Sequence, residues 1–208
     1  MRYSDMLNDE IMQIIFEFIQ CCGIDFRSCL QLGNCNGDLE LNLLDHFSGL
    51  KIDSYNLSSR EKSSVESRLI FYQGRFRYIA TDYRKEKIEH GYDLVISPFD
   101  LSRLSKEEKQ RLFIKIHHAL VEKGHFIYGD TVKASSEKIK AIYTQSETKR
   151  ILQQPPQRIA SGEHGENHLR NRSLLAIDDQ MYWMRKSAFK DVDCIWKFFD
   201  AAVFVGFK

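Results

Sequence analysis

Short apolar runs alternate along the chain with longer stretches in which apolar residues recur every three or four positions. The short runs are typical of buried strands, and the longer stretches are typical of amphipathic helices. The pattern predicts strands over residues 29–32, 50–54, 76–81, 92–97 and 125–130, and helices over 5–22, 39–47, 58–69 and 105–120. This alternation predicts an α/β fold with a doubly wound parallel sheet and right-handed crossovers.

Two of the predicted helices begin with the sequence of a capping box, Ser58 with Glu61 and Ser105 with Glu108. In this motif the serine side chain accepts a hydrogen bond from the backbone three residues later. The glutamate side chain accepts one from the serine backbone in return. We therefore expect both helices to begin at these serines.

The pattern changes beyond residue 132. It predicts helices over 135–152 and 178–187, a polar loop or lid over 158–172, and two strands over 189–199 and 202–207. The last two strands would be joined around Asp200, which predicts a hairpin at the edge of the sheet.

The turn between the first strand and the helix that follows it has a glycine at each end, Gly33 and Gly37. Glycine lets the backbone approach a ligand closely, and the start of a helix offers N–H groups without partners. This sequence is typical of the first unit of a nucleotide-binding sheet. It is equally common as a bare connection, so both interpretations stay open at this point.

Composition and charge argue against a nucleic-acid-binding, membrane or secreted protein. The 208 residues include 30 basic and 29 acidic ones, so the net charge of +1 creates no field toward nucleic acid or membranes. No apolar run has the length of a membrane span, and the first residues do not open a secretory signal. Five cysteines without a Cys-x-x-Cys pair predict reduced thiols and a cytoplasmic location.

The ordered series of motifs resembles the class I S-adenosylmethionine-dependent methyltransferases of the small stand-alone type. Residues 31–38, Gln-Leu-Gly-Asn-Cys-Asn-Gly-Asp, stand where that family has an acid followed by Gly-x-Gly-x-Gly. Further matches are Asp82 after the third strand, the fourth strand at 92–97, the turn at 120–124 and the terminal strands at 189–193 and 202–206. The resemblance implies a mostly parallel seven-stranded, Rossmann-like sheet with helices on both faces and an antiparallel C-terminal hairpin.

The resemblance also implies one methyltransferase-like domain over 1–208. We expect an N-terminal helix over 1–27, a cofactor-binding core over 28–132, a helical lid or loop insertion over 133–187 and the terminal hairpin over 188–208.

The implied cofactor is S-adenosylmethionine, and the resemblance assigns it partners around the first turn. The backbone around Gly33, Cys35 and Gly37 would lie against its methionine part, Gln31 would hold its amino group and Asn56 would accept hydrogen bonds from its ribose. Gln31 and Asn56 stand where the family has acids, and Cys35 where it has a glycine. Two lost charge-assisted hydrogen bonds, each worth on the order of 1 kcal/mol, predict a cofactor bound roughly 10- to 100-fold more weakly.

The adenine and methyl ends of the cofactor would meet later residues. By resemblance, Asp82 would accept a hydrogen bond from the adenine amine and Tyr83 would pack on the adenine ring. Ser97, Pro98 and Phe99, at the end of the fourth strand, would face the transferred methyl group. This placement agrees with the rule that ligands lie at the carboxyl ends of strands in open α/β sheets.

Methyl transfer requires alignment more than a fixed catalytic group, because the cofactor carries the reactivity. Asp130, at the end of the predicted fifth strand, is the candidate base. His117 and His118 fit structural positions on a helix better. His164 and His168 share a spacing that suits a metal, but no third ligand is evident, so no metal site is predicted.

Three groups of residues are candidates for binding the methyl acceptor, and the first is Pro98 with Phe99, assigned to the substrate pocket at the end of the fourth strand. Tyr182 and Trp183 lie on the predicted helix 178–187 and are assigned to the substrate pocket, with core packing as the alternative. A basic set would suit an anionic acceptor or RNA: Lys149, Arg150, Arg158, Arg170 and Arg172. Nearby glutamates offset these charges and no aromatic residues are interleaved for base stacking, so nucleic acid is not an expected partner.

The leading prediction is a methyltransferase that uses S-adenosylmethionine and acts on a small-molecule acceptor. The alternative is a catalytically degenerate protein of this fold that acts as a binding or scaffold partner, which Gln31, Cys35 and Asn56 favour. An RNA methyltransferase is a third interpretation. A protein partner stays open, and the sequence predicts neither the acceptor nor the oligomeric state.

Overall fold

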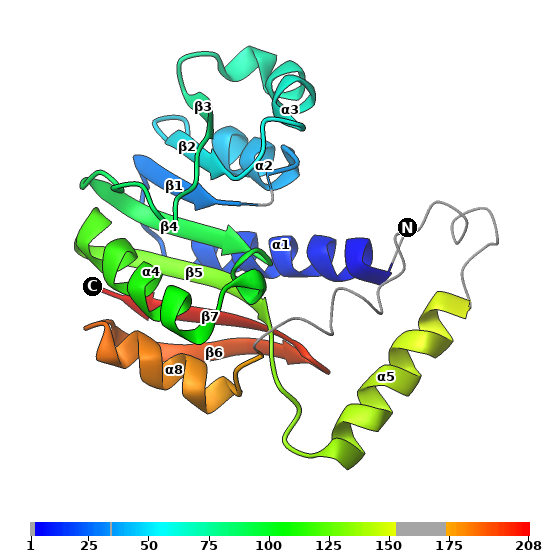
Figure 1. The fold of residues 1–208 in the computed structure, drawn as a ribbon. Helices are drawn as coiled ribbons and strands as arrows, with labels where there is room; N and C mark the ends of the chain where they lie inside the picture. The colour runs from blue at the N-terminus through cyan, green and yellow to red at the C-terminus, as the bar shows by residue number, and fades with distance from the viewer. Residues whose placement is uncertain (1–2, 34, 153–173) are drawn as a thin grey trace.

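The structure, a computed structural model, describes residues 3–33, 35–152 and 174–208 (Figure 1). Its centre is a seven-stranded sheet with the strand order β3-β2-β1-β4-β5-β7-β6. The strands are β1 (Ser28–Leu32), β2 (Lys51–Asn56), β3 (Phe76–Ala80), β4 (Tyr92–Pro98), β5 (Leu120–Thr131), β6 (Lys190–Phe198) and β7 (Ala201–Phe207). Neighbouring strands among the first five in this order, β3-β2-β1-β4-β5, pair in parallel. Strand β7 is antiparallel to β5 and to β6. The predicted fold class, including the terminal hairpin, is confirmed.

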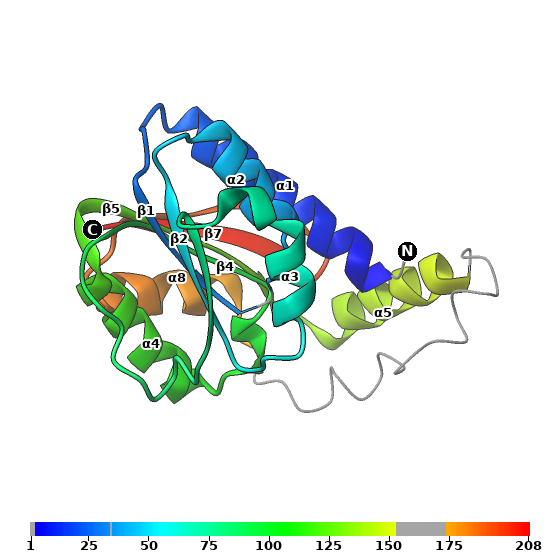
Figure 2. The ribbon, with the colours of Figure 1, turned by 90° about the horizontal axis from the view of Figure 1, so that it is seen from above.

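Helices cover both faces of this sheet (Figure 2). One face carries α1 (Tyr3–Cys21), α2 (Asp38–His46) and α3 (Lys62–Arg68), and the other carries α4 (Lys106–Ala119) and α8 (Ile177–Lys186). Two short 3-10 helices, η1 (Ile70–Tyr72) and η2 (Leu101–Arg103), precede β3 and α4. Helix α5 (Glu137–Leu152) lies next to α1, and its Tyr143 hydroxyl accepts a hydrogen bond from Lys197 Nζ of β6 at 3.0 Å.

Two hydrophobic clusters hold these layers together. Ile11, Ile15 and Leu43 belong to the cluster between the sheet and helices α1 to α3. Phe113 and Met184 belong to the cluster under α4 and α8. The nearly continuous apolar run of β4 contributes to both clusters, because a central strand of a parallel sheet is buried on both faces.

The two predicted capping boxes have different outcomes. At the start of α4, Ser105 Oγ accepts from the Glu108 N–H at 3.2 Å and Glu108 Oε2 accepts from the Ser105 N–H at 2.9 Å, so this box is confirmed. The box predicted at Ser58 is wrong. Helix α3 has Glu61 at its N-cap, with no side-chain cap, and Ser58 Oγ instead accepts from the Arg60 N–H at 3.0 Å in the preceding turn.

The fifth strand is longer than predicted. It begins at Leu120, directly after α4 ends, and runs through the turn predicted at 120–124. Lys123 has a left-handed backbone with φ 65°, and the register between β4 and β5 shifts between Tyr92 and Leu94. The predicted loop or lid over 158–172 lies outside the described residues. Within the described residues, no helix combines the length and apolar character required to cross a membrane.

Candidate functional site

The carboxyl ends of β1 and β4 mark the point where the strand order of the sheet reverses. Strand β1 pairs with β2 on one side and with β4 on the other, and the chain continues outward in opposite directions from the two. Ligands of open α/β sheets bind in the crevice outside such strand ends. Here the residues at these strand ends are Gly33 and residues 35–37 of the β1 turn, together with Phe99 and Asp100 after β4, and we call this edge of the sheet the β1–β4 crevice.

Both glycines of the β1 turn have a left-handed backbone, with φ 67° at Gly33 and 92° at Gly37. A Cβ atom at Gly33 would overlap the carboxyl group of Asp100, and one at Gly37 would lie 2.9 Å from Cδ of Arg68. Glycine at position 33 therefore lets the Asp100 side chain reach across from the end of β4 to the β1 turn. The sequence analysis missed Asp100, although an acid directly after a buried strand was a signal for it.

Asp100 is paired with the residue predicted to stack on adenine. The Tyr83 hydroxyl donates to Asp100 Oδ2, and Arg103 Nε lies 3.8 Å from Oδ1. Tyr83 is fully buried within the α4-side cluster, and this burial, with the Asp100 charge, raises the pKa of its hydroxyl. The Tyr83 side chain has no exposed surface in this structure, and its predicted packing on the adenine ring stays a prediction.

Asp82 lies after β3, as predicted for a residue that would meet the adenine. Its two carboxylate oxygens accept from Arg84, Oδ1 from Nε at 2.7 Å and Oδ2 from Nη2 at 2.8 Å. These hydrogen bonds lower the pKa of Asp82 to about 2. Asp82 is therefore ionised, and its contact with adenine stays a prediction.

Asn56 ends β2 and is tied to the β1 turn. Its Oδ1 accepts from the Cys35 N–H at 3.4 Å, while its Nδ2 donates to the Ser54 carbonyl at 3.2 Å and to Ser54 Oγ at 2.8 Å. The amide thus serves both as acceptor for the turn and as donor to its own strand. Its predicted hydrogen bonds to a ribose stay a prediction.

A buried polar cluster of Gln31, Cys35, Glu40, Ser54 and Asn56 lies beneath the β1 turn. Gln31 donates from Nε2 to the Gly33 carbonyl at 3.4 Å. Burial raises the pKa of Glu40, and the Cys35 and Gln31 side chains and the Gly37 N–H lower it in part. Burial and the Glu40 charge raise the pKa of the Cys35 thiol, so Cys35 is a protonated thiol without nucleophilic activation.

Glu40 was not a candidate in the sequence analysis. It lies in the first turn of α2, and the signal for it was an acid that shares a helical face with Leu43 and Leu44. Its two carboxyl oxygens and Gln31 Oε1 have no hydrogen-bond partner within the described chain.

The residues at the end of β4 connect that strand to its neighbours. Ser97 is fully buried and donates from Oγ to the Leu32 carbonyl of β1 at 2.9 Å. Pro98 ends β4, and the Phe99 N–H donates to the Gly129 carbonyl of β5 at 3.1 Å. Phe99 has φ 62°, a left-handed conformation that turns the chain at the crevice. Their predicted position facing a methyl group stays a prediction.

Asp130, the candidate base, lies in a buried polar network instead of an open pocket. Its Oδ2 accepts from Lys109 Nζ, and its Oδ1 accepts from the Thr131 N–H at 2.8 Å. Lys109 also donates to Gln180 Oε1 at 3.3 Å, and the Tyr128 hydroxyl donates to the same oxygen at 2.9 Å. Both oxygens of Asp130 are thus engaged by the fold.

Tyr182 and Trp183 lie on α8, which packs on β6, β7 and α4. In the strand order, β4, β5 and β7 come between β1 and β6. Lys106 Nζ lies 5.0 Å from the centre of the Trp183 ring, and Lys186 Nζ 5.5 Å from that of Tyr182. Their predicted place in the substrate pocket stays a prediction.

The histidines considered for chemistry lie apart from the crevice. The His117 ring packs edge-on against Phe189 at 5.2 Å between ring centres, and burial lowers its pKa. His164 and His168 lie outside the described residues. In the part of the chain that the structure describes, no three His, Cys, Asp or Glu side chains are grouped to hold a metal ion.

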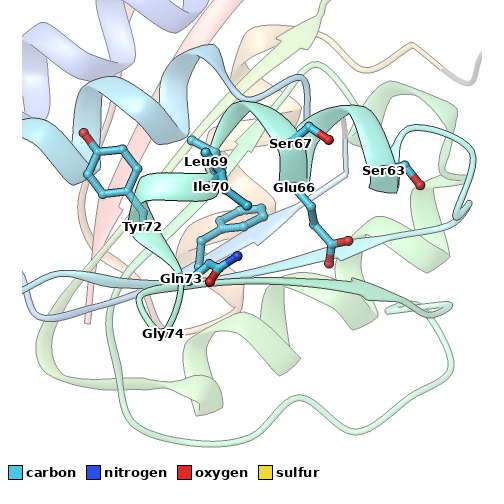
Figure 3. Close-up of a pocket in the computed structure, with 9 residues that line it drawn as sticks. Ser63, Glu66, Ser67, Leu69, Ile70, Tyr72, Gln73 and Gly74 are labelled. Atoms are coloured by element: carbon cyan, nitrogen blue, oxygen red, sulfur yellow. The ribbon is translucent and has the colours of Figure 1, made fainter.

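A separate groove of about 520 Å³ lies beside α3 at the edge of the sheet (Figure 3). It is lined by Ser63, Glu66, Ser67, Leu69, Ile70, Tyr72, Gln73, Gly74 and Phe76. None of these lining residues is one of the predicted cofactor-binding residues, so the groove and the β1–β4 crevice are different places.

Comparison with solved structures identifies the fold. The S-adenosylmethionine-dependent methyltransferase SibL superposes with a TM-score of 0.67 and 17% identity, over 99% of this chain and 55% of that one. An O-methyltransferase family protein from Burkholderia thailandensis has a TM-score of 0.68 and 11% identity, over 98% and 59%. Human N-acetylserotonin methyltransferase in complex with SAM has a TM-score of 0.59 and 14% identity, over 95% and 54%.

These likenesses show that the chain has the class I methyltransferase fold. No protein-family model and no curated protein matches the sequence. The chain spans little more than half the length of the solved structures described above.

Proposed function

We propose that the chain binds S-adenosylmethionine at the β1 turn and transfers its methyl group to a small-molecule acceptor. The observation that carries this proposal is the architecture of the β1–β4 crevice. Left-handed glycines at 33 and 37 border the point where the strand order reverses, as a nucleoside ligand lying against the main chain requires. The likeness to solved methyltransferases, one of them in complex with SAM, supports the proposal.

The residues around the crevice fit the chemistry of such a cofactor. Acceptor oxygens without donors lie beneath the β1 turn, where an amino group would find partners. Asn56 ends β2 and would lie toward the ribose, and Asp82 follows β3 and would lie toward the adenine. The cofactor, when bound, supplies an electrophilic methyl group, and these residues would hold and orient it.

We assign Asp130 a structural role in place of the predicted role as base. Its carboxylate is fully buried and engaged by Lys109 and the Thr131 backbone, so it has no oxygen facing the crevice. Methyl transfer to an acceptor that is already nucleophilic needs only alignment, so the proposed reaction does not depend on Asp130.

Isothermal titration calorimetry with S-adenosylhomocysteine tests the proposal. We expect a dissociation constant in the micromolar range, weakened by the neutral residues Gln31 and Asn56 and by the Cys35 side chain. 5′-Methylthioadenosine, which shares the nucleoside thioether but lacks the amino-acid end, should bind more weakly at the same site. A dissociation constant in the millimolar range or above for S-adenosylhomocysteine would contradict the proposal.

That negative result would favour the second candidate, a catalytically degenerate protein of this fold that acts as a scaffold. The observations that favour it are the neutral Gln31 and Asn56 and the engaged carboxylate of Asp82. An RNA acceptor finds less support, since the net charge is +1. A cytoplasmic location remains a prediction from the cysteines, all five of which are free thiols.

A further inference from the structure

Three buried oxygen atoms beneath the β1 turn accept no hydrogen bond of good geometry within the described residues: Gln31 Oε1 and both carboxyl oxygens of Glu40. The nearest donors, the Cys35 and Gln31 side chains and the Gly37 N–H, lie close enough to Glu40 to lower its pKa but are not aligned for such bonds. The Gln31 and Glu40 side chains are 0% exposed. A buried acceptor without a donor is costly, and native structures rarely keep several together. The arrangement therefore indicates a donor group that a ligand brings.

The three oxygens come from two elements that meet at the candidate site. Gln31 is the second residue before Gly33 on β1, and Glu40 lies in the first turn of α2, just after the left-handed Gly37. The Gln31 side chain and the Gly37 N–H are both close enough to lower the pKa of Glu40. The carboxyl group of Glu40 thus lies next to Gln31 and directly beneath the turn.

The three acceptor oxygens of Gln31 and Glu40 limit which chemical group of a ligand could bind them. A carboxylate and an amide oxygen repel an anion, and a hydroxyl group supplies one donor for three acceptors. A primary ammonium supplies three N–H donors and a positive charge that matches the single negative charge of Glu40.

We propose that Glu40 supplies the negative charge that binds the ammonium group at the methionyl end of the cofactor, with Gln31 Oε1 as a second acceptor. This inference rests on the proposed function. It places the charge on α2, nine residues after the position where the sequence has the neutral Gln31. Glu40 is then a binding residue, and it compensates in part for the loss of the acid at position 31.

Binding should depend on pH because an ammonium pairs with the ionised form of Glu40. Burial raises the pKa of Glu40 in the free protein, so the carboxyl group holds its proton up to a higher pH than usual. The affinity for the ammonium ligand should therefore fall as the pH is lowered through that raised pKa. The Glu40→Gln variant should lack this pH dependence, since its side chain carries no titrating proton.

The decisive comparison uses S-adenosylhomocysteine and its deamino analogue, which differ only in the amino group. The native protein should bind S-adenosylhomocysteine roughly 10- to 100-fold more tightly than the analogue, as a charge-assisted hydrogen bond predicts. In Glu40→Gln this preference should disappear, with the affinity for the deamino analogue unchanged. Glu66→Gln, on α3, is the control and should keep the preference.

Each other outcome overturns the inference. Equal weakening of both ligands in Glu40→Gln would mean that Glu40 only shapes the turn, and an unchanged preference would mean that the ammonium binds elsewhere. If the native protein binds both ligands equally in the micromolar range, the inference fails while the proposed function stands. If it binds neither ligand, both fail. Circular dichroism and thermal unfolding of Glu40→Gln verify that the variant is folded.

Discussion

Replacing Lys109 with methionine should lower the free energy of unfolding by about 3–5 kcal/mol, because it leaves the Asp130 carboxylate buried without a partner charge. The two side chains are 2% and 0% exposed, and Lys109 Nζ donates to both Asp130 and Gln180. Methionine keeps much of the length and apolar volume of lysine, so the loss of the charge dominates the effect. Urea unfolding followed by circular dichroism measures the change.

Two controls identify the cause of this loss. Lys140→Met breaks an exposed pair with Glu137, whose side chains are 66% and 86% exposed, and should change stability by less than about 1 kcal/mol. The double variant Lys109→Met/Asp130→Leu should recover most of the stability, because an apolar pair needs no charge compensation. A loss below about 1 kcal/mol for Lys109→Met would contradict the structural role of Asp130.

Replacing Gly33 with alanine should cost about 1–3 kcal/mol more than the same change at Gly23, because only at Gly33 does the new methyl group meet another side chain. The two glycines have nearly the same left-handed backbone, with φ 67° and 65°. A Cβ atom at Gly23 has no atom within 4 Å, whereas one at Gly33 overlaps Asp100. The difference between the two variants in urea unfolding therefore isolates the contact with Asp100.

The same pair of variants tests the site. Gly33→Ala should weaken S-adenosylhomocysteine binding roughly 100-fold, because displacement of the turn misplaces the groups that would hold the ligand. Gly23→Ala, at the end of the N-terminal helix, should leave binding unchanged. Equal stability losses in the two variants, or equal affinities, would contradict the account of the β1–β4 crevice.

Much of the fold could be predicted from the sequence because apolar periodicity determines the elements locally. The continuous apolar run of β4 and the capping box at Ser105 are examples, since each signal lies within a few residues of its effect. The capping box predicted at Ser58 is wrong because a second local interaction competes for the same side chain. The hydroxyl of Ser58 binds the nearby Arg60 N–H in a turn, a competing use of the same side chain.

The site was less predictable because its groups meet across the fold. Asp100 and Tyr83 lie 17 residues apart, so the sequence analysis could not pair them, and it considered only Tyr83 as a candidate. Glu40 and Lys109 could have been predicted, because each is a charged residue on the apolar face of a helix. Lys109 is paired with the buried Asp130, whereas the carboxyl oxygens of Glu40 have no hydrogen-bond partner within the described residues.

The central claim is that an adenosyl ligand lies against the main chain of the β1 turn. A crystal structure of the protein with S-adenosylhomocysteine tests it most directly. We predict ligand density in the crevice between β1 and β4, with its amino-acid end at Gly33 and its nucleoside toward the ends of β2 and β3. Density only in the groove beside α3, or Asp100 still packed against Gly33 with no ligand density at saturating ligand, would contradict the claim.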